Sequence, residues 1–320
     1  MCVDLSIIIP VYNAEKWISK MLRSIIYNNL NVEIILINDG STDNSANVCK
    51  LEQEINSDIR YFEQKRHGVS YTRNRGITLA RGKYITFFDA DDYLSPDMIT
   101  NMYQAINNSE LDMVVCNHVY EDDKGNYIYS QEYEGANTLS MEKALELAIN
   151  RYCFGGYLWN KIFRKSLIDK YSICFDSSLE VYEDLLFVIN YLKCCKKIMY
   201  LEFCGYHYVK HLSSSFAEYS LNKYCQRVQA LDRIEKNLME YSNLQGLMEI
   251  RISNAIVDYI KIIQKKSLMF QKNIYSKAVA EISKNHIKEI LGIKKIKISR
   301  RIILLLYVIW CYIFYRERVA

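Results

Sequence analysis

The chain has 320 residues, half of them apolar, so it can bury a substantial core in one large domain or two of ordinary size. This composition excludes an intrinsically disordered protein. The formal net charge of +4 hides an asymmetry, because residues 261–320 carry a large excess of Lys and Arg while the remainder is net acidic.

The first third of the chain alternates short apolar runs with helical patterns. LSIIIPV at residues 5–11 is a continuous apolar run, which suits a central parallel strand. Apolar residues at helical spacing then predict a helix over Ala14–Tyr27, with Asn13 available to cap it. Further strands are expected at 32–37, 59–62 and 83–88, and further helices at 45–54 and 71–80. This alternation predicts the α/β class with a doubly wound parallel sheet.

The rest of the chain shifts toward helix. A helix is expected from Pro96 to Asn107, followed by an apolar strand at 113–115 and a hairpin around Lys124 and Gly125. Helices are then expected at 140–151, 158–170 and 183–193, and strands at 198–203 and 206–209. From Leu221 onward the pattern indicates helix and basic linker, which predicts a C-terminal helical extension.

Ten cysteines occur without a CxxC pair or a zinc-type spacing with histidine. Together with the lack of an apparent secretory signal, this usage indicates buried or incidental thiols in a reducing cytoplasm. A metal-binding or disulfide role for them is the less favoured alternative.

The sharpest chemical signal is YITFFDADDYL, a buried strand that runs into Asp89, Ala90, Asp91 and Asp92. Clustered carboxylates repel one another unless a cation compensates, and hard oxygen ligands suit Mg²⁺ or Mn²⁺ that also holds a diphosphate. Two alternatives are an acidic turn that caps the next helix and a phosphoacceptor aspartate at a strand end. In a doubly wound sheet, the loops at the carboxyl ends of the other strands should converge on the same cleft.

Four segments of this sequence together resemble glycosyltransferase family 2, namely SIIIPVYNAEKWI, LINDGSTDNS, GVSYTRNRGITLARGKYITFFDADDYL and VYEDLLF. The resemblance covers roughly residues 4–216. It implies the GT-A fold, a Rossmann-like, mainly parallel mixed sheet flanked by helices, and inverting transfer from a nucleotide-diphospho sugar. It further implies a catalytic domain at 1–216, with a nucleotide-sugar half to about residue 110 and an acceptor half beyond it, before the helical basic region 217–320.

The resemblance assigns the nucleotide to the first two loops. Pro10, Val11 and Tyr12 match the segment that packs against the base and ribose, with Glu15 nearby, although ordinary strand-end packing is the alternative. Asp39 matches the aspartate that accepts a hydrogen bond from uracil, and a charged acceptor strengthens such a bond.

The resemblance assigns the diphosphate to the next two loops. Arg73 is the expected cationic contact, with a solvated helix face as the alternative. Asp89, Ala90 and Asp91 are assigned to the donor site, with Asp91 as the principal ligand of Mn²⁺ or Mg²⁺ and Asp89 beside the ribose or a metal-bound water. His211 is a candidate metal or diphosphate contact, or else a structural histidine.

The acceptor side rests on two further motifs. Glu183 and Asp184 match the family's acidic pair, in which the aspartate acts as the base that removes the acceptor proton. The alternative is a stabilising acidic first turn of a helix. Trp159, Asn160 and Lys161 match a WNK segment that is expected to contact the acceptor or to support the site structurally.

The tail carries fourteen uninterrupted apolar or aromatic residues at 302–315, flanked by arginines. As a helix this segment is about 21 Å long, short of the approximately 30 Å hydrocarbon core of a membrane. It is therefore expected to lie in the inner leaflet as a peripheral anchor, favoured over nucleic-acid binding. A buried helix that closes the domain or a homodimer is the alternative.

These observations predict an inverting, metal-dependent glycosyltransferase that uses a UDP-sugar. It would extend a lipid-linked glycan in bacterial surface polysaccharide synthesis, at the cytoplasmic face of the membrane. The rival interpretation is a catalytically silent nucleotide-sugar-binding module that anchors a membrane assembly complex.

Overall fold

The structure is a computed structural model that describes residues 3–27, 30–131, 133, 135, 137–150, 155–211, 221–252, 254–255 and 258. The chain divides into two compact units, Met1–Arg251 and Ile252–Ala320, and the sheet belongs to the first. The apolar segment predicted at 302–315 lies outside the described residues. Within them, no helix combines the length and the hydropathy that crossing a membrane requires.

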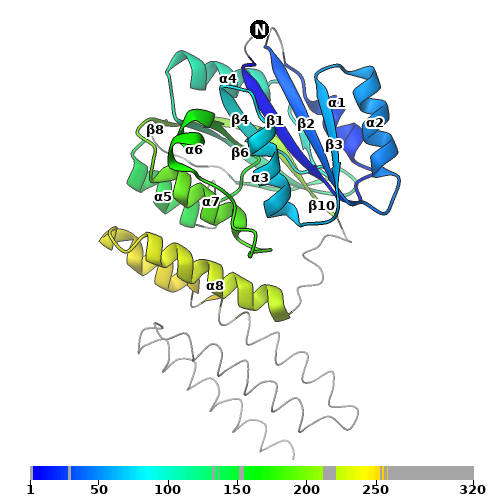
Figure 1. Cartoon of the computed structure of the whole chain (residues 1–320). Coiled ribbons are helices and arrows are strands. Elements are labelled where there is room, and N and C mark those ends of the chain that lie inside the picture. The colour runs from blue at the N-terminus through cyan, green and yellow to red at the C-terminus, as the bar shows by residue number, and fades with distance from the viewer. Residues whose placement is uncertain are drawn as a thin grey trace, which may run out of the picture. The chain divides into compact units, whose positions relative to one another are not determined.

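One mixed sheet of ten strands forms the centre of the part of the chain that the structure describes (Figure 1). Its order is β3-β2-β1-β4-β9-β6-β10-β5, with β7 beside β6 and β8 beside β10. The strands are β1 Leu5–Val11, β2 Val32–Asp39, β3 Ile59–Gln64, β4 Tyr84–Phe87, β5 Tyr93–Leu94, β6 Met113–Asp122, β7 Tyr127–Gln131, β8 Thr138–Leu139, β9 Lys161–Arg164 and β10 Ile198–Lys210. Strands β1 to β4 pair in parallel, whereas β9 runs antiparallel to both β4 and β6. The predicted α/β class is confirmed.

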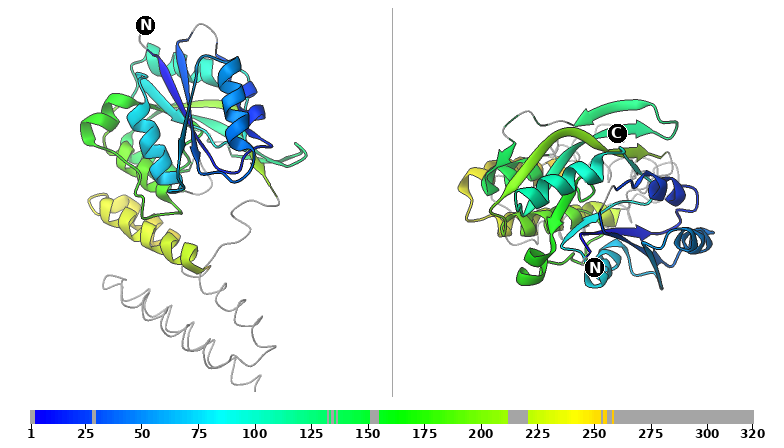
Figure 2. Two further views of the ribbon diagram at one scale, coloured as in Figure 1. Left: turned by 45° about the vertical axis from the view of Figure 1, so that its right-hand side comes forward. Right: turned by 90° about the horizontal axis from the view of Figure 1, so that it is seen from above.

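Helices cover both faces of the sheet (Figures 1 and 2). They are α1 Ile18–Ser24, α2 Ser45–Ile55, α3 Val69–Leu79, α4 Met98–Asn108, α5 Met141–Ile149, α6 Lys165–Tyr171, α7 Glu183–Leu192 and α8 Leu221–Asn237. Alternate side chains of β1 point to opposite helix layers, as expected for a strand that is buried on both faces. Ile7 and Ile9 belong to the core with α1, α2 and α4, whereas Ile8 faces α3.

The helix α3 lies unusually close to β1. A methyl group at Gly76 would collide with the side chain of Ile8, so only glycine allows this approach. At the start of the same helix, Gly68 adopts a positive φ of 92°. Both glycines therefore fix where α3 begins and how deep it sits, which places Arg73 beneath the carboxyl ends of the strands.

Two predicted helices were wrong in part. Residues 161–164 of the helix expected at 158–170 form β9 instead, because their backbone pairs with β4 on one side and with β6 on the other. The helix expected from Ala14 begins only at Ile18, because the amides of Ala14 and Glu15 donate to Ser45 Oγ and Asp43 Oδ2. Asn13 does not cap it, since its side-chain oxygen accepts from Thr42 N at 2.8 Å.

The two strands expected at 198–203 and 206–209 are a single strand, β10. Irregular register with β6 between Leu201 and Tyr206 explains why its pattern breaks in the middle. The hairpin predicted around Lys124 and Gly125 is confirmed and joins β6 to β7.

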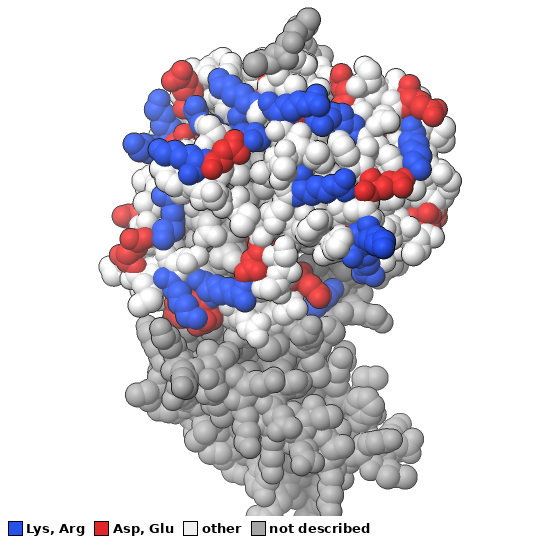
Figure 3. All heavy atoms as spheres, in the orientation of Figure 1, with Lys and Arg blue, Asp and Glu red and all other residues white. Residues whose placement is uncertain are grey.

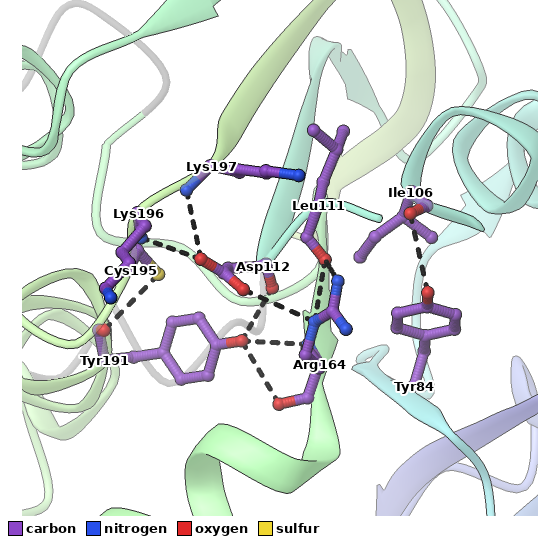
Figure 4. Close-up of polar contacts among 9 residues, drawn as sticks. All are labelled: Tyr84, Ile106, Leu111, Asp112, Arg164, Tyr191, Cys195, Lys196 and Lys197. Carbon is purple, nitrogen blue, oxygen red and sulfur yellow. Dashed lines mark hydrogen bonds and ion pairs between the residues drawn. The ribbon is translucent and has the colours of Figure 1, made fainter. Parts of the chain in front are cut away.

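A polar junction ties β6, β9, α7 and β10 together at the end of the sheet away from the cleft (Figure 4). The Tyr191 hydroxyl donates to the Asp112 carbonyl at 2.7 Å and accepts from Arg164 N at 2.8 Å. The Asp112 carboxylate accepts from Lys196 N and Lys197 N at 2.7 and 3.0 Å and pairs with Arg164. Because Tyr191 lies near the end of α7, the junction anchors the helix that presents Glu183 and Asp184 at its other end.

Surface charge does not single out a site on the face shown in Figure 3. Lys and Arg side chains are spread over the described part of this face, with Asp and Glu among them. A surface of mixed sign is ordinary solvated exterior.

Candidate active site

A cleft of about 1030 Å³ opens at the carboxyl ends of the parallel strands. Residues from the four predicted loops line it, including Tyr12, Asp39, Arg73 and Asp91. Among the predicted site residues, those that line the cleft are Pro10, Val11, Tyr12, Asp39, Arg73, Asp89, Ala90, Asp91, Trp159, Glu183, Asp184 and His211. The side chains of Glu15, Asn160 and Lys161 are employed outside its lining.

Glu15 supports the loop rather than the cleft. Its carboxylate accepts from Asn44 N at 2.8 Å, and its own amide donates to Asp43. The side chain of Glu15 therefore holds two loops together, next in sequence to the segment predicted to pack against the nucleotide.

Asp39 organises the loop that leads into α3. Its Oδ1 accepts from His67 N at 2.8 Å and Gln64 Nε2 at 2.7 Å, and its Oδ2 accepts from Gly68 N at 2.8 Å. A carboxylate offers about four acceptor sites, so these three donors leave room for one more at the cleft.

Tyr12 and Arg66 form a pair at the mouth of the cleft. Tyr12 is 40% exposed, and the Arg66 guanidinium lies 4.3 Å from the centroid of its ring. Both side chains line the cleft. Nothing in the sequence motifs distinguished Arg66, because its position depends on the loop that Asp39 holds through His67 N and Gly68 N and that packs against Gly40.

The DADD loop separates its aspartates into two environments. Asp91 lines the cleft with its side chain 44% exposed, whereas Asp92 is buried and accepts from Tyr206 Oη at 2.7 Å and Val209 N at 2.8 Å. The Tyr206 hydroxyl also accepts from Asp89 N at 3.2 Å. Asp92 and Tyr206 thus fasten the loop to β10, a role of Tyr206 that no motif indicates.

Arg73 lies between the two acidic motifs. Its Nη1 donates to Glu183 Oε1 at 2.9 Å and its Nη2 to Asp89 Oδ1 at 3.1 Å, with the side chain only 8% exposed. Burial alone would lower the pKa of Arg73, but the charges of Asp89 and Glu183 raise it. Within the described residues its buried Nε has no hydrogen-bond partner. The arginine predicted to contact phosphate therefore also links the DADD loop to α7.

The oxygen and nitrogen donors that a divalent cation would use belong to Asp91, Asp89 and His211. His211 Nε2 lies 3.2 Å from the Asp91 carbonyl oxygen and 3.9 Å from Asp91 Oδ2, and its ring packs against Trp17. Burial and then the charge of Asp89 raise the pKa of Asp91 to about 6, while His211 lowers it. No three His, Cys, Asp or Glu side chains in the described part of the chain already converge as a finished metal site. The residues fit a cation that takes two carboxylates and completes its shell with water and phosphate.

Asp184 lies at the first turn of α7 beside Glu183. Burial, followed by the charge of Glu183, raises its pKa to about 7, although Arg73 and the Leu185 amide lower it. The amide donates to Asp184 Oδ1 at 2.6 Å. A carboxylate that titrates near neutral pH and faces a cleft has the properties of a general base.

The turn before this pair is strained. Tyr182 has a positive φ of 61°, which is unusual for a bulky side chain and persists only where the surroundings enforce it. Its ring lies 5.3 Å from the Arg227 guanidinium and 5.1 Å from that of Arg251, and its hydroxyl accepts from Arg227 Nε at 2.9 Å.

The helix α8 holds the whole segment that leads to this turn. Gln226 Oε1 accepts from Glu180 N at 3.0 Å, and Arg233 pairs with Asp176. Together with the Arg227 contact, these bonds fix residues 176–182 from outside the sheet. The region predicted as a basic helical extension after residue 217 therefore also supports the site, a contribution that no motif in the sequence indicates.

The WNK segment supports the cleft wall. Lys161 is fully buried and donates to the carbonyls of Gly155 and Tyr157 at 3.0 and 2.7 Å and to Asn160 Oδ1 at 2.8 Å. Burial lowers the pKa of Lys161 to about 7. Asn160 Nδ2 in turn donates to the Cys116 carbonyl at 2.9 Å. Of the two roles predicted for Asn160 and Lys161, these contacts describe structural support.

Comparisons with known proteins agree with this geometry. The family model described as glycosyl transferase family 2 matches residues 6–172. EpsH of Bacillus subtilis (strain 168), which its name describes as a glycosyltransferase, is 33% identical over 221 residues that cover 67% of this chain and 63% of EpsH. The chain therefore spans a little less than two thirds of that relative's length.

Two solved structures share the fold. S. aureus TarS 1–349 in complex with UDP has a TM-score of 0.61 at 17% identity, covering 79% of this chain and 71% of that chain. The mannosyltransferase PcManGT from Pyrobaculum calidifontis, in complex with GDP-Man and Mn²⁺, has a TM-score of 0.56 at 12% identity, covering 88% and 79%. At these identities the likeness shows the fold alone, and it confirms the predicted GT-A arrangement. Since the family model spans more than half of its residues, the chain belongs to glycosyltransferase family 2.

Proposed function

We propose that this protein is an inverting, metal-dependent glycosyltransferase that moves a sugar from a UDP-sugar to a glycan acceptor. The observation that carries the proposal is the meeting of Asp184, with its pKa near 7, and Asp91 in one cleft that also contains Asp39. These groups come from distant parts of the chain, and together they supply a base, a cation ligand and a nucleotide contact.

The nucleotide is proposed to bind at the ends of β1 and β2. The remaining acceptor site of Asp39 would receive the ring N–H of uracil, and Pro10, Val11 and Tyr12 would pack against the base and ribose. The complex of TarS with UDP supports UDP as the nucleotide.

The diphosphate is proposed to lie between Arg73 and Asp91. Bound by Asp91 and Asp89, with His211 adjacent, Mn²⁺ or Mg²⁺ would neutralise the charge that develops on the leaving diphosphate. The complex of PcManGT with Mn²⁺ supports this choice of cation. Arg73 adds a fixed positive charge to the same region of the cleft, which Ala90 also lines.

Asp184 is proposed to take the proton of the acceptor hydroxyl as its oxygen attacks the anomeric carbon. The new carbon–oxygen bond forms on the face opposite the departing diphosphate, whose bond to the same carbon breaks, so the configuration inverts. One carboxylate is sufficient for this step. Glu183 holds Arg73 and raises the pKa of its neighbour.

A donor panel tests the proposal. The purified protein is incubated with Mn²⁺ or Mg²⁺ and each common UDP-sugar, and released UDP is measured. We expect release from at least one donor, and a loss of about 10²-fold in Asp91→Asn because the diphosphate loses its counter-charge. Asp97→Asn, an exposed aspartate outside the cleft, serves as the control. Binding of UDP without turnover of any donor would favour the silent binding module instead.

The acceptor is proposed to be a lipid-linked glycan of bacterial surface polysaccharide synthesis. Residues 1–216 would form the catalytic domain, and the apolar segment 302–315 would attach the protein peripherally to the cytoplasmic face of the membrane.

Deletion of residues 299–320 tests the attachment. We expect the full chain to pellet with membranes and the shortened chain to stay in the supernatant, because the shortened chain lacks the apolar surface that would be buried in the membrane. A salt wash of the full chain separates the contribution of the basic residues, since ionic strength screens them. Equal pelleting of both chains would show that the segment is not the anchor.

A further inference from the structure

A row of tyrosines crosses three neighbouring strands at the cleft. Tyr129 of β7 lies opposite Tyr120 of β6, and Tyr120 lies opposite Tyr208 of β10. The rings of Tyr129 and Tyr120 stack with centroids 4.3 Å apart and planes 23° apart, and those of Tyr120 and Tyr208 meet edge to face at 5.2 Å. All three side chains line the cleft.

Tyr129 differs from the rest of this row in its exposure. Tyr120 is 6% exposed, as a core residue would be, whereas Tyr129 is 38% exposed although it lines the cleft. It stands on β7, which pairs with β6 alone among the described strands. One face of its ring covers Tyr120, so the exposed surface includes the opposite face.

Lys210 lies beside the stack and leaves that outer face open. Its ammonium is 5.0 Å from the Tyr120 centroid and 4.7 Å from the Tyr129 centroid. A cation over the outer face of Tyr129 would be much farther from Tyr120, because the two rings are themselves 4.3 Å apart. The two nearly equal distances therefore place the ammonium at the side of the pair, clear of the outer face of Tyr129.

Trp159, the aromatic residue predicted to contact the acceptor, offers no such face. One side of its indole stacks on Tyr206 at 4.4 Å and another on Tyr157 at 4.7 Å, both with planes 12° apart. Since it is only 5% exposed, it supports the cleft wall and presents at most an edge. Tyr157 continues the wall toward the tyrosine row, because its hydroxyl accepts from Tyr120 Oη at 3.2 Å.

The outer member of the row, Tyr129 of β7, lies away from the strands that carry Asp39 and Asp89, whereas the β10 end of the row adjoins His211. Asp39 ends β2 and Asp89 follows β4, whereas β6, β7 and β10 lie on the other side of β4, beyond β9. Asp184 lines the same cleft from α7. The volume of about 1030 Å³ is at the upper end of the range for small-molecule sites, which leaves space for a second sugar beside the nucleotide.

We propose that the outer face of Tyr129 is an acceptor subsite that binds a pyranose ring, with Lys210 donating to one of its hydroxyl groups. The proposal rests on the proposed function, since the bound ring is the acceptor glycan. A pyranose presents a patch of C–H groups on one face and hydroxyls around its rim. The C–H face matches the negative π face of a tyrosine, and the hydroxyls need a donor of the kind that Lys210 provides.

Saturation-transfer NMR on the full chain with methyl glycosides of the common hexoses and N-acetylhexosamines tests the subsite. Four proteins are compared: wild type, Tyr129→Ala, Tyr129→Phe and Tyr127→Ala. Tyr127 is the matched control, because it is 65% exposed on the same strand but does not line the cleft. UDP binding is measured in the same samples.

We expect the wild type to bind at least one glycoside through its ring C–H protons, and Tyr129→Ala to weaken this affinity about tenfold. Tyr129→Phe and Tyr127→Ala should retain it, because the first keeps the aromatic face and the second lies outside the cleft. Equal binding by wild type and Tyr129→Ala, or no glycoside binding by the wild type, would overturn the subsite. UDP binding reports separately on the proposed function, because the glycoside measurement requires no donor.

Discussion

Replacing Asp184 by Asn is expected to lower kcat for sugar transfer by roughly 10³-fold while leaving the affinity for UDP unchanged. Asparagine keeps the size of the side chain and can still accept from the Leu185 amide, which donates to Asp184 Oδ1 at 2.6 Å. It cannot take a proton from the acceptor. The measurement is a single-turnover transfer assay together with a UDP titration of both proteins.

Asp123→Asn is the control for this substitution, because Asp123 is exposed and lies outside the cleft. If Asp184→Asn transferred sugar within tenfold of the wild-type rate, another group would have to be the base. A parallel loss of UDP affinity would indicate a disturbed cleft instead of a missing base.

The acid limb of the pH profile checks the same assignment without a mutation. Burial and the charge of Glu183 raise the pKa of Asp184 to about 7, and only the deprotonated carboxylate can act as a base. The value of kcat/KM should therefore fall about tenfold per pH unit below about pH 7 and level off above it. A profile that stays flat down to pH 5 would be incompatible with a base of this pKa.

The part of the fold that could be predicted from the sequence is β1 to β4 with their helices, where the apolar pattern of each segment matches its burial in the structure. The dense apolar run of β1 and the alternation through β4 predict a parallel sheet, and the polar loops at the strand ends predict the cleft. The pattern of 158–164 was misread because β9 is antiparallel and buried on both faces. A charged side chain such as Lys161 is unexpected in a buried strand, but its ammonium is satisfied by the carbonyls of Gly155 and Tyr157.

The residues that sequence reasoning missed act across long separations. Tyr206 holds Asp92 from more than a hundred residues away, and Arg227 holds Tyr182 from a helix that follows the family match. No periodicity or motif reports such pairs, because they depend on where β10 and α8 pack. Arg66 belongs with them, since its contact with Tyr12 requires the β1 and β3 loops to meet.

Arg73 is the residue at which stability and chemistry should be most tightly linked. It is the guanidinium that pairs with both Asp89 and Glu183, and its side chain is 8% exposed. Removing one member of a buried ionic group leaves the other charges buried without a partner, so Arg73→Met should lower the free energy of unfolding by about 3–5 kcal/mol. The measurement is urea denaturation, in which the midpoint should fall with the slope unchanged.

Arg75→Met is the matched control on the same helix. Arg75 binds the Glu63 carbonyl and Gln64 Oε1 at 3.0 and 2.9 Å and touches neither acidic motif, so its loss should cost about 1 kcal/mol or less. Arg73→Lys should fall between the two, because an ammonium keeps the charge but cannot span two carboxylates as a planar fork does. Equal destabilisation by Arg73→Met and Arg75→Met would show that the pairing with Asp89 and Glu183 contributes little.

The double variant Arg73→Met, Glu183→Gln distinguishes two causes of destabilisation, a buried carboxylate left without its partner and the loss of packing around Arg73. Neutralising Glu183 removes one uncompensated carboxylate, so the double variant should regain part of the stability that Arg73→Met loses. The two single variants of Arg73 should also differ in the pH dependence of kcat/KM. In Arg73→Lys, which keeps a charge near Asp184, the acid limb of the profile should stay close to that of the wild type. In Arg73→Met the acid limb should move to higher pH, because Arg73 is the neighbour whose charge lowers the pKa of Asp184. An unshifted limb in a folded Arg73→Met protein would separate the arginine from the base that it is proposed to tune.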